Sequence, residues 1–212
     1  METKDPSLQI ATFLLQTQAV KLRPNDPFRW SSGWLSPIYC DNRVTLSFPE
    51  IRSFIKSALA QLIQEAFPEG EVIGGVATAG IPQGALVADL LELPFLYVRP
   101  QPKGHGMGNQ IEGHLEPGKK VVLVEDLIST GQSSLKAAQA VREAGAEVIG
   151  LAAIFTYGFR VAAENFAQAH IPLKSLSTYQ SLVQVAAAEG YISEDSLQAL
   201  ESWRTAPEKW GK

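Results

Sequence analysis

The chain of 212 residues is long enough for one ample domain with a large buried core. Hydrophobic residues make up 45% and charged residues 19% of it, a globular composition that excludes a disordered protein. Its formal net charge of -4 gives no electrostatic footprint for nonspecific nucleic-acid binding, although a local basic patch is compatible with it.

Cysteine content and hydropathy indicate the compartment. Cys40 is the single cysteine, so no internal disulfide can form. We find no secretory leader, no arginine-rich transit peptide and no apolar run of membrane-spanning length. We therefore expect a cytoplasmic protein with neither a membrane nor a nucleic acid as partner.

The first elements predicted along the chain are a helix, an aromatic-rich segment and a second helix. Apolar spacing predicts a helix over residues 7–20, with Ser7 as its cap after Pro6. Residues 24–43 contain three prolines, which favours irregular chain or a hairpin. Residues 49–67 then have the spacing of an amphipathic helix.

From residue 72 onward strands and helices alternate. Strands are predicted at residues 72–77, 95–99, 119–125, 147–155 and near 173–176, and helices at residues 81–91, 133–144, 161–169, 179–189 and 194–203. Such alternation predicts an α/β fold with a parallel sheet and right-handed crossovers. Because no linker separates the segments, we expect a single domain over residues 1–212, with a core of about residues 46–170. Residues 1–45 and the C-terminal tail would form a hood over it.

The run VVLVEDLISTGQSS at residues 121–134 is the segment most informative about function. Its apolar part is typical of a strand buried on both faces, and ligands bind outside the carboxyl ends of such strands. The chain is expected to leave the sheet at Glu125 and Asp126. The turn at residues 129–134 then opens a helix whose N–H groups and positive dipole end suit a phosphate, and Gly131 tolerates a positive φ. The run indicates a site for a phosphorylated, metal-bound ligand; the alternative is a pair of solvated acids before an ordinary helix cap.

Two further loops are candidates for binding anions. The segment of residues 100–118 is polar and glycine-rich, and it follows Arg99 with Lys103 and His105 near its start, which is typical of a lid that presents cations. The alternative is an exposed hairpin tip with incidental charges. The loop of residues 78–82 follows the first strand of the sheet. It is either an ordinary turn or a cradle for a second anionic group.

The run at residues 121–133 resembles the phosphoribosyl-pyrophosphate (PRPP) signature of the type I phosphoribosyltransferase family. Three more segments, FRWSSGWLSPIYCDNR, GVATAGIPQGALVAD and YVRPQPKGHGMGNQIEG, follow the order and spacing of the members that act on orotate. This resemblance covers essentially the whole chain. It implies a central, mostly parallel sheet flanked by helices, with a small hood. It also implies Mg²⁺-dependent transfer of ribose 5-phosphate from PRPP to orotate, which gives orotidine 5'-monophosphate and pyrophosphate in pyrimidine biosynthesis.

The resemblance also implies residue roles. The catalytic residues would be Lys103, His105, Glu125 and Asp126, with Asp126 assisting magnesium through water. The residues implied to bind PRPP are Thr78, Ala79, Gly80, Arg99, Lys103, His105, Glu125, Asp126, Leu127, Ile128, Ser129, Thr130, Gly131, Gln132 and Ser133. The residues implied to bind orotate are Ser129, Arg160, Tyr39 and Cys40.

The remaining expectations concern the assembly of the protein and the base that it accepts. The family resemblance implies a homodimer in which the lid closes over the neighbouring subunit's site, and it leaves a complex with the next enzyme of the pathway open. Pro100 and Gln101 stand where many members carry a further lysine, and Ala79 and Ser31 stand where some members carry one. The alternatives are transfer to another base, or a non-catalytic PRPP sensor that binds nucleic acid. The presence of Glu125, Asp126 and Lys103 and the negative net charge disfavour the sensor.

Overall fold

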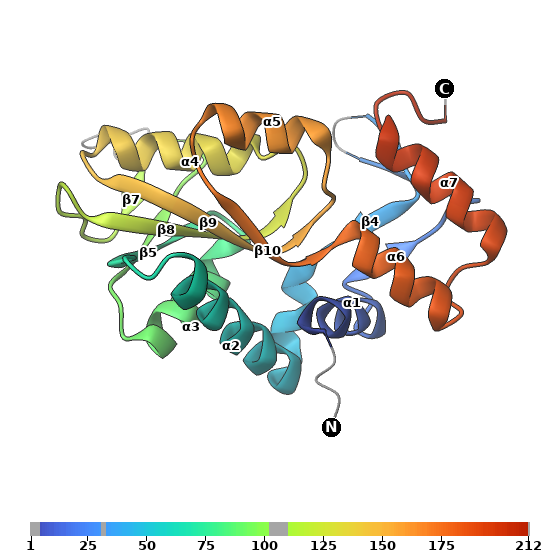
Figure 1. The fold of residues 1–212 in the computed structure, drawn as a ribbon, viewed down its shortest axis with the longest axis horizontal. Coiled ribbons are helices and arrows are strands. Elements are labelled where there is room, and N and C mark those ends of the chain that lie inside the picture. Colours follow the sequence, from blue (N-terminus) through green and yellow to red (C-terminus); the bar gives the residue numbers. More distant parts are fainter. Residues whose placement is uncertain (1–4, 31–32, 102–109, 212) are drawn as a thin grey trace. The chain divides into compact units, whose positions relative to one another are not determined.

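The computed structural model describes residues 5–30, 33–101 and 110–211 (Figure 1). The chain divides into two compact units. One combines the two terminal segments, Met1–Ile51 and Ser177–Lys212, and the other is the central segment Arg52–Leu176. This division does not test whether the two act as a single domain with a hood, so that expectation stays a prediction.

The terminal unit joins both ends of the chain. Its elements are α1 (Pro6–Gln16), β1 (Val20–Leu22), β2 (Phe28–Arg29), β3 (Leu35–Ser36), β4 (Ile38–Cys40), the 3-10 helix η1 (Asn42–Ser47), α6 (Tyr179–Ala188) and α7 (Glu194–Thr205). β1 pairs antiparallel with β4 and β2 with β3, so the aromatic segment forms strand pairs rather than irregular chain. The Ser177 hydroxyl donates to the Ser7 carbonyl at 2.8 Å, which ties α1 to the segment that leads into α6.

The first helix differs from the prediction at both ends. Asp5 caps it in place of Ser7, because the Asp5 carboxylate accepts a hydrogen bond from the Ser7 N–H at 2.9 Å. The helix ends at Gln16, and Gln18 then takes a left-handed backbone with φ of 56°. The chain turns there and continues as β1 instead of extending the helix to residue 20.

The central unit is built on a six-stranded sheet in the order β10-β9-β8-β5-β6-β7. Its strands are β5 (Val72–Val76), β6 (Phe95–Val98), β7 (Ile111–Glu112), β8 (Lys120–Ile128), β9 (Glu147–Thr156) and β10 (Leu173–Thr178), and its helices are α2 (Pro49–Ala66), α3 (Gly80–Leu91), α4 (Gln132–Glu143) and α5 (Arg160–Gln168). β5 pairs parallel with β6 and β8, and β8 with β9. The mostly parallel sheet flanked by helices is confirmed.

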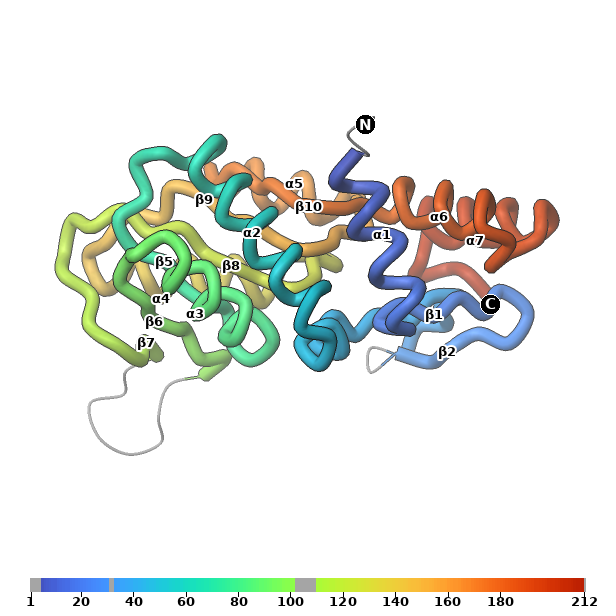
Figure 2. The backbone as a smooth tube through the Cα atoms, turned by 90° about the horizontal axis from the view of Figure 1, so that it is seen from below, coloured from blue at the N-terminus to red at the C-terminus, as the bar shows by residue number. Residues whose placement is uncertain are grey.

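The helices of this unit cover both faces of the sheet. In Figure 1 α4 and α5 lie along one face and α2 and α3 along the other, and Figure 2 shows α2 and α3 side by side from below. Residues 121–124 of β8 are completely buried, at 0% exposed, as their continuous apolar pattern predicts. In the part of the chain that the structure describes, no helix combines the length and apolar character needed to cross a membrane.

Two features of the sheet correct the sequence prediction. The predicted loop of residues 100–118 contains the strand β7, which pairs antiparallel with β6 through Tyr97 and Glu112. In addition, the chain does not leave the sheet at Glu125, because β8 stays paired with β9 as far as Ile128 opposite Thr156. Both errors concern pairings with distant strands, which local sequence patterns do not reveal.

Candidate active site

The acids lie where β8 extends beyond its neighbour. β8 pairs with β5 only as far as Val124 opposite Gly75, whereas its pairing with β9 continues to Ile128. A strand that outruns its neighbour leaves space beside its carboxyl end, which is where open α/β sheets bind ligands. Glu125 and Asp126 are the first two residues of this extension.

Glu125 is held inside the protein. Glu125 is only 6% exposed. Its Oε1 atom accepts a hydrogen bond from the Asp126 N–H at 3.1 Å, and its Oε2 atom accepts one from the Ser134 hydroxyl at 3.3 Å. Burial, and then the neighbouring Asp126 carboxylate, raise the pKa of Glu125 well above its ordinary value. Asp126 is only half-buried, so it is the more accessible acid of the pair.

The turn that follows β8 presents an uncapped helix end. Gly131 has φ of 79°, as predicted, and a side chain there would lie 2.6 Å from the Phe166 ring. The Asn165 amide donates to the Thr130 carbonyl at 3.0 Å and so fixes the turn against α5. Among the residues that the structure describes, no side chain caps α4, and Gln132 and Ser133 are exposed. The first N–H groups of α4 are therefore available to an anion.

The loop after β5 lies directly against the acidic strand end. A Cβ atom on Gly80 would be 2.4 Å from the Val124 carbonyl oxygen and 3.3 Å from the Glu125 Cα. Only glycine permits this approach of α3 to β8. The peptide bond between Ala77 and Thr78 is cis. Because β5 and β8 are neighbouring strands, the loop of residues 77–80 lies next to the strand end that carries Glu125.

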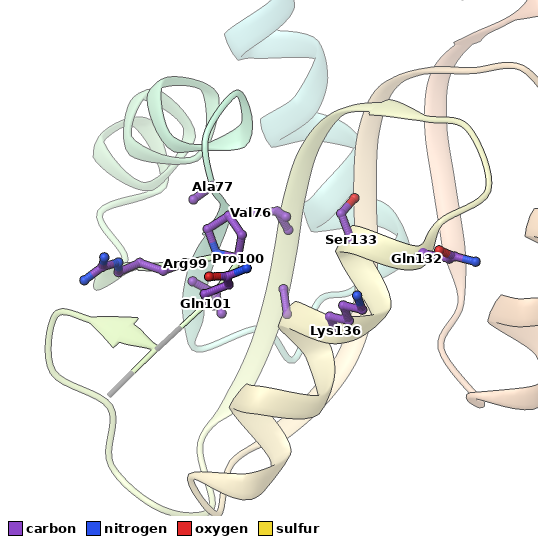
Figure 3. A pocket seen from close by; sticks show the side chains of 10 residues that line it. Val76, Ala77, Arg99, Pro100, Gln101, Gln132, Ser133 and Lys136 are labelled. Carbon is purple, nitrogen blue, oxygen red and sulfur yellow. The ribbon is translucent and has the colours of Figure 1, made fainter. Parts of the chain in front are cut away.

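A cavity of about 350 Å³ opens between the ends of β5 and β6 and the first turns of α4 (Figure 3). Its lining residues are Val76, Ala77, Val98, Arg99, Pro100, Gln101, Gln132, Ser133, Lys136 and Ala137. The cavity therefore connects the loop after β5, the start of the predicted lid and the turn of residues 129–133, called the phosphate turn below. Its two cationic lining residues come from opposite sides, Arg99 from the end of β6 and Lys136 from α4.

Arg99 is held at the base of the predicted lid. Its N–H donates to the Gln110 carbonyl at 2.8 Å, and the Gln110 amide donates back to the Arg99 carbonyl at 3.1 Å. Its guanidinium lies 3.4 Å from a Glu112 carboxylate oxygen. Lys103 and His105, the other predicted lid residues, lie outside the described residues.

The residues expected to bind orotate come from both units. Arg160 begins α5 in the central unit, where its side chain is 91% exposed and lies 3.3 Å from Glu164, and Ser129 is the first residue of the phosphate turn. Tyr39 and Cys40 belong to β4 of the terminal unit, where Tyr39 is exposed and the Cys40 thiol donates to the Asn42 side chain at 3.2 Å. Two of the residues expected to bind orotate therefore belong to the central unit and the other two to the terminal unit.

Some residues at the site were missed or misjudged from the sequence. Ser134 and Glu112 were not assigned roles, although they hold Glu125 and Arg99. Ile128 was expected to bind PRPP, but its side chain is 0% exposed in the core, so only its backbone is left for such a role. Lys136 was also missed, although its spacing four residues after Gln132 places both on one helix face.

Comparison with known proteins defines the class. Residues 47–173 match a family model described as the phosphoribosyl transferase domain, which covers more than half of the chain. The site and the sheet therefore belong to a phosphoribosyltransferase.

Closer relatives define the family within this class. The chain is 55% identical over 204 residues to orotate phosphoribosyltransferase of Cytophaga hutchinsonii, covering 96% of this chain and 98% of the relative. It is 56% identical over 199 residues to the Bacillus subtilis enzyme of the same name, with 94% and 92% covered. The chain belongs to the orotate phosphoribosyltransferase family, which confirms the resemblance.

Solved structures agree with this assignment. Orotate phosphoribosyltransferase from Aeropyrum pernix superposes with a TM-score of 0.71 at 30% identity, covering 82% of this chain and 97% of that one. The Mycobacterium tuberculosis enzyme in complex with PRPP gives a TM-score of 0.65 at 23% identity, with 84% and 98% covered. At that identity the second likeness shows the fold alone.

Proposed function

We propose that this protein transfers the ribose 5-phosphate group from PRPP to orotate, giving orotidine 5'-monophosphate and pyrophosphate in pyrimidine biosynthesis. The main support for this function is that three features lie together at one edge of the sheet. These are the uncapped start of α4, the accessible Asp126 and the close loop at Gly80. The names of the relatives at about 55% identity support orotate as the acceptor.

The phosphate of the ribose 5-phosphate group would bind at the turn of residues 129–133. No side chain within the described ranges caps the N–H groups at the start of α4, and the positive end of the helix dipole adds to their attraction for an anion. The exposed Ser133 hydroxyl would donate a further hydrogen bond. The loop of residues 78–80 would face the pyrophosphate group, because Gly80 places it against the same strand end.

The site would catalyse the reaction mainly by stabilising the charges that develop as the bond breaks. When the bond from the anomeric carbon to pyrophosphate breaks, positive charge develops on the ribose and negative charge on the leaving group. Asp126 would stabilise the ribosyl charge directly. Glu125 would orient the strand end that carries Asp126, because its buried carboxyl accepts hydrogen bonds from the Asp126 N–H and the Ser134 hydroxyl.

The residues of this site suit a magnesium ion that binds together with the substrate phosphates. Within the described ranges no three or more His, Cys, Asp or Glu side chains are grouped to hold a metal, so a cage made by the protein alone is not formed there. Mg²⁺ commonly binds through one or two carboxylates together with substrate phosphates and water. Asp126 would meet the ion through water. The ion would neutralise charge on the departing pyrophosphate.

Several parts of the proposal rest on the family resemblance. Arg99, Lys103 and His105 would form a lid that excludes water and supplies cations, closing over the site of a second subunit in a homodimer. Ser129, Arg160, Tyr39 and Cys40 would bind orotate. We expect the enzyme to act in the cytoplasm, with a complex with the next pathway enzyme left open.

The direct test is an assay of the purified protein with PRPP, Mg²⁺ and orotate, followed by the loss of orotate's ultraviolet absorbance. We expect loss of absorbance that depends on all three components. Parallel reactions with adenine and uracil test the acceptor. Product from either base and none from orotate would contradict the proposed specificity, and no product from any base, with an intact fold by circular dichroism, would contradict the activity itself.

A further inference from the structure

Lys136 lies in the second turn of α4, on the wall of the cavity that joins the phosphate turn to the end of β6 (Figure 3). It is three residues after Ser133 and four after Gln132, and both of these also line the cavity. Side chains on a helix lean toward its amino end and cover the preceding turn. The Lys136 side chain therefore extends toward the first turn of α4, where the uncapped N–H groups lie.

Lys136 is exposed near the amino end of α4, where an anion would meet both the lysine and the helix N–H groups. The amino end of a helix carries partial positive charge, and a lysine beside it is repelled. α4 has no acidic residue in its first turn to offset that repulsion. In the ranges that the structure describes, no carboxylate lies within ion-pair distance of Lys136. An anion in the cavity would offset this repulsion.

The other cationic lining residue is placed differently. Arg99 already has a carboxylate partner, because its guanidinium lies 3.4 Å from Glu112. In Figure 3 this guanidinium lies on the side of the cavity farther from α4. The loop of residues 77–80, Ala-Thr-Ala-Gly, brings no cation to the opposite wall. Among the described lining residues, Lys136 is thus the cation left to meet a ligand beside Ser133.

We propose that Lys136 is a substrate-binding residue whose ammonium group contacts a phosphate oxygen of PRPP in this cavity. The inference rests on the proposed function and adds to it a cation from α4 that the sequence comparison does not assign. It predicts that Lys136 contributes to binding of the phosphorylated donor and not to binding of the base. Its effect should appear in the KM for PRPP rather than in kcat or in the KM for orotate.

The test compares PRPP binding by calorimetry in the wild type, Lys136→Met, Lys136→Arg and the control Lys174→Met. Lys174 is exposed on β10, so its replacement removes the same charge away from the cavity. We expect Lys136→Met to bind PRPP about tenfold more weakly at low salt, and the loss to shrink as salt rises. Lys136→Arg should retain most of the binding, and Lys174→Met all of it. The melting temperature of Lys136→Met should be close to that of the wild type, because Lys136 is exposed.

Two ligand probes then locate the contact. Ribose 5-phosphate and inorganic pyrophosphate are titrated separately into the wild type and Lys136→Met. Weaker binding of either probe supports the proposal and identifies the phosphate group concerned. Equal binding of PRPP and of both probes by a folded Lys136→Met, with normal turnover in the wild type, would overturn this inference alone. A wild type that binds no PRPP would overturn the proposed function together with it.

Discussion

Glu125 and Asp126 are adjacent in the chain but have different surroundings. Glu125 is buried and accepts hydrogen bonds from the Asp126 N–H and the Ser134 hydroxyl, whereas Asp126 is half-buried beside the open end of β8. Neighbouring carboxylates in unlike environments can serve unlike roles. We assign the accessible charge to Asp126 and an orienting role to Glu125.

Replacement of Asp126 by Asn tests the first role. The change keeps the shape of the side chain and removes its charge, so we expect kcat to fall by about 10²-fold or more while the fold is kept. Steady-state kinetics with orotate and PRPP measure this, with Asp89→Asn on the exposed surface of α3 as the control. Equal turnover in the two variants would contradict the role of Asp126.

Replacement of Glu125 by Gln tests the raised pKa. Below the ordinary pKa of 4.5 both folded and unfolded states hold the proton, so pH has no effect there. As pH rises from 4.5, the unfolded state releases the proton more readily than the buried carboxyl, and the free energy of unfolding of the wild type falls. The amide of Gln cannot ionise, and it can keep both hydrogen bonds.

The measurement is thermal unfolding without ligand between pH 4 and pH 8. We expect the melting temperature of Glu125→Gln relative to the wild type to rise by about 3 °C or more across this range. Glu143→Gln, on the exposed surface of α4, is the control. Parallel pH profiles for Glu125→Gln and the wild type would show that Glu125 ionises as freely in the folded protein as in the unfolded one.

At the scale of elements, the site depends on a strand that is longer than its neighbour and on helices that approach it closely. β8 continues to Ile128 beside β9 after β5 has ended. α4 then begins after the left-handed Gly131, and α3 packs against the strand end through Gly80. Together these place two helix starts beside one pair of acids.

Replacement of Gly80 by Ala tests the close approach of α3. The added methyl would lie 2.4 Å from the Val124 carbonyl oxygen, so either α3 or β8 must move. A displacement of about 1 Å at a catalytic site can cost on the order of 10²-fold in rate. We expect a large loss of kcat/KM for PRPP. Gly190→Ala, at a left-handed position with no neighbour within 4 Å, should lower stability modestly and leave the rate unchanged.

At the scale of the whole molecule, binding of PRPP should stabilise the folded chain. A ligand that binds only the native state at 100 times its Kd adds about 2.7 kcal/mol to the free energy of unfolding. For a chain of this size that raises the melting temperature by about 5 to 10 °C. Thermal unfolding with PRPP and Mg²⁺ measures the shift, with sucrose at the same concentration as the control. No shift at saturating PRPP would contradict binding to the native state.

The sequence by itself determined the helices of the central unit, its parallel strands except for the end of β8, and the burial of residues 121–124. These follow from the periodicity of apolar residues and from local turn chemistry, which act over a few neighbouring positions. The tertiary structure alone decided that β8 runs to Ile128, that Glu125 is buried against Ser134 and that Lys136 faces the cavity. Strand length, burial and the direction of a side chain depend on segments distant in the sequence, and only packing brings these together.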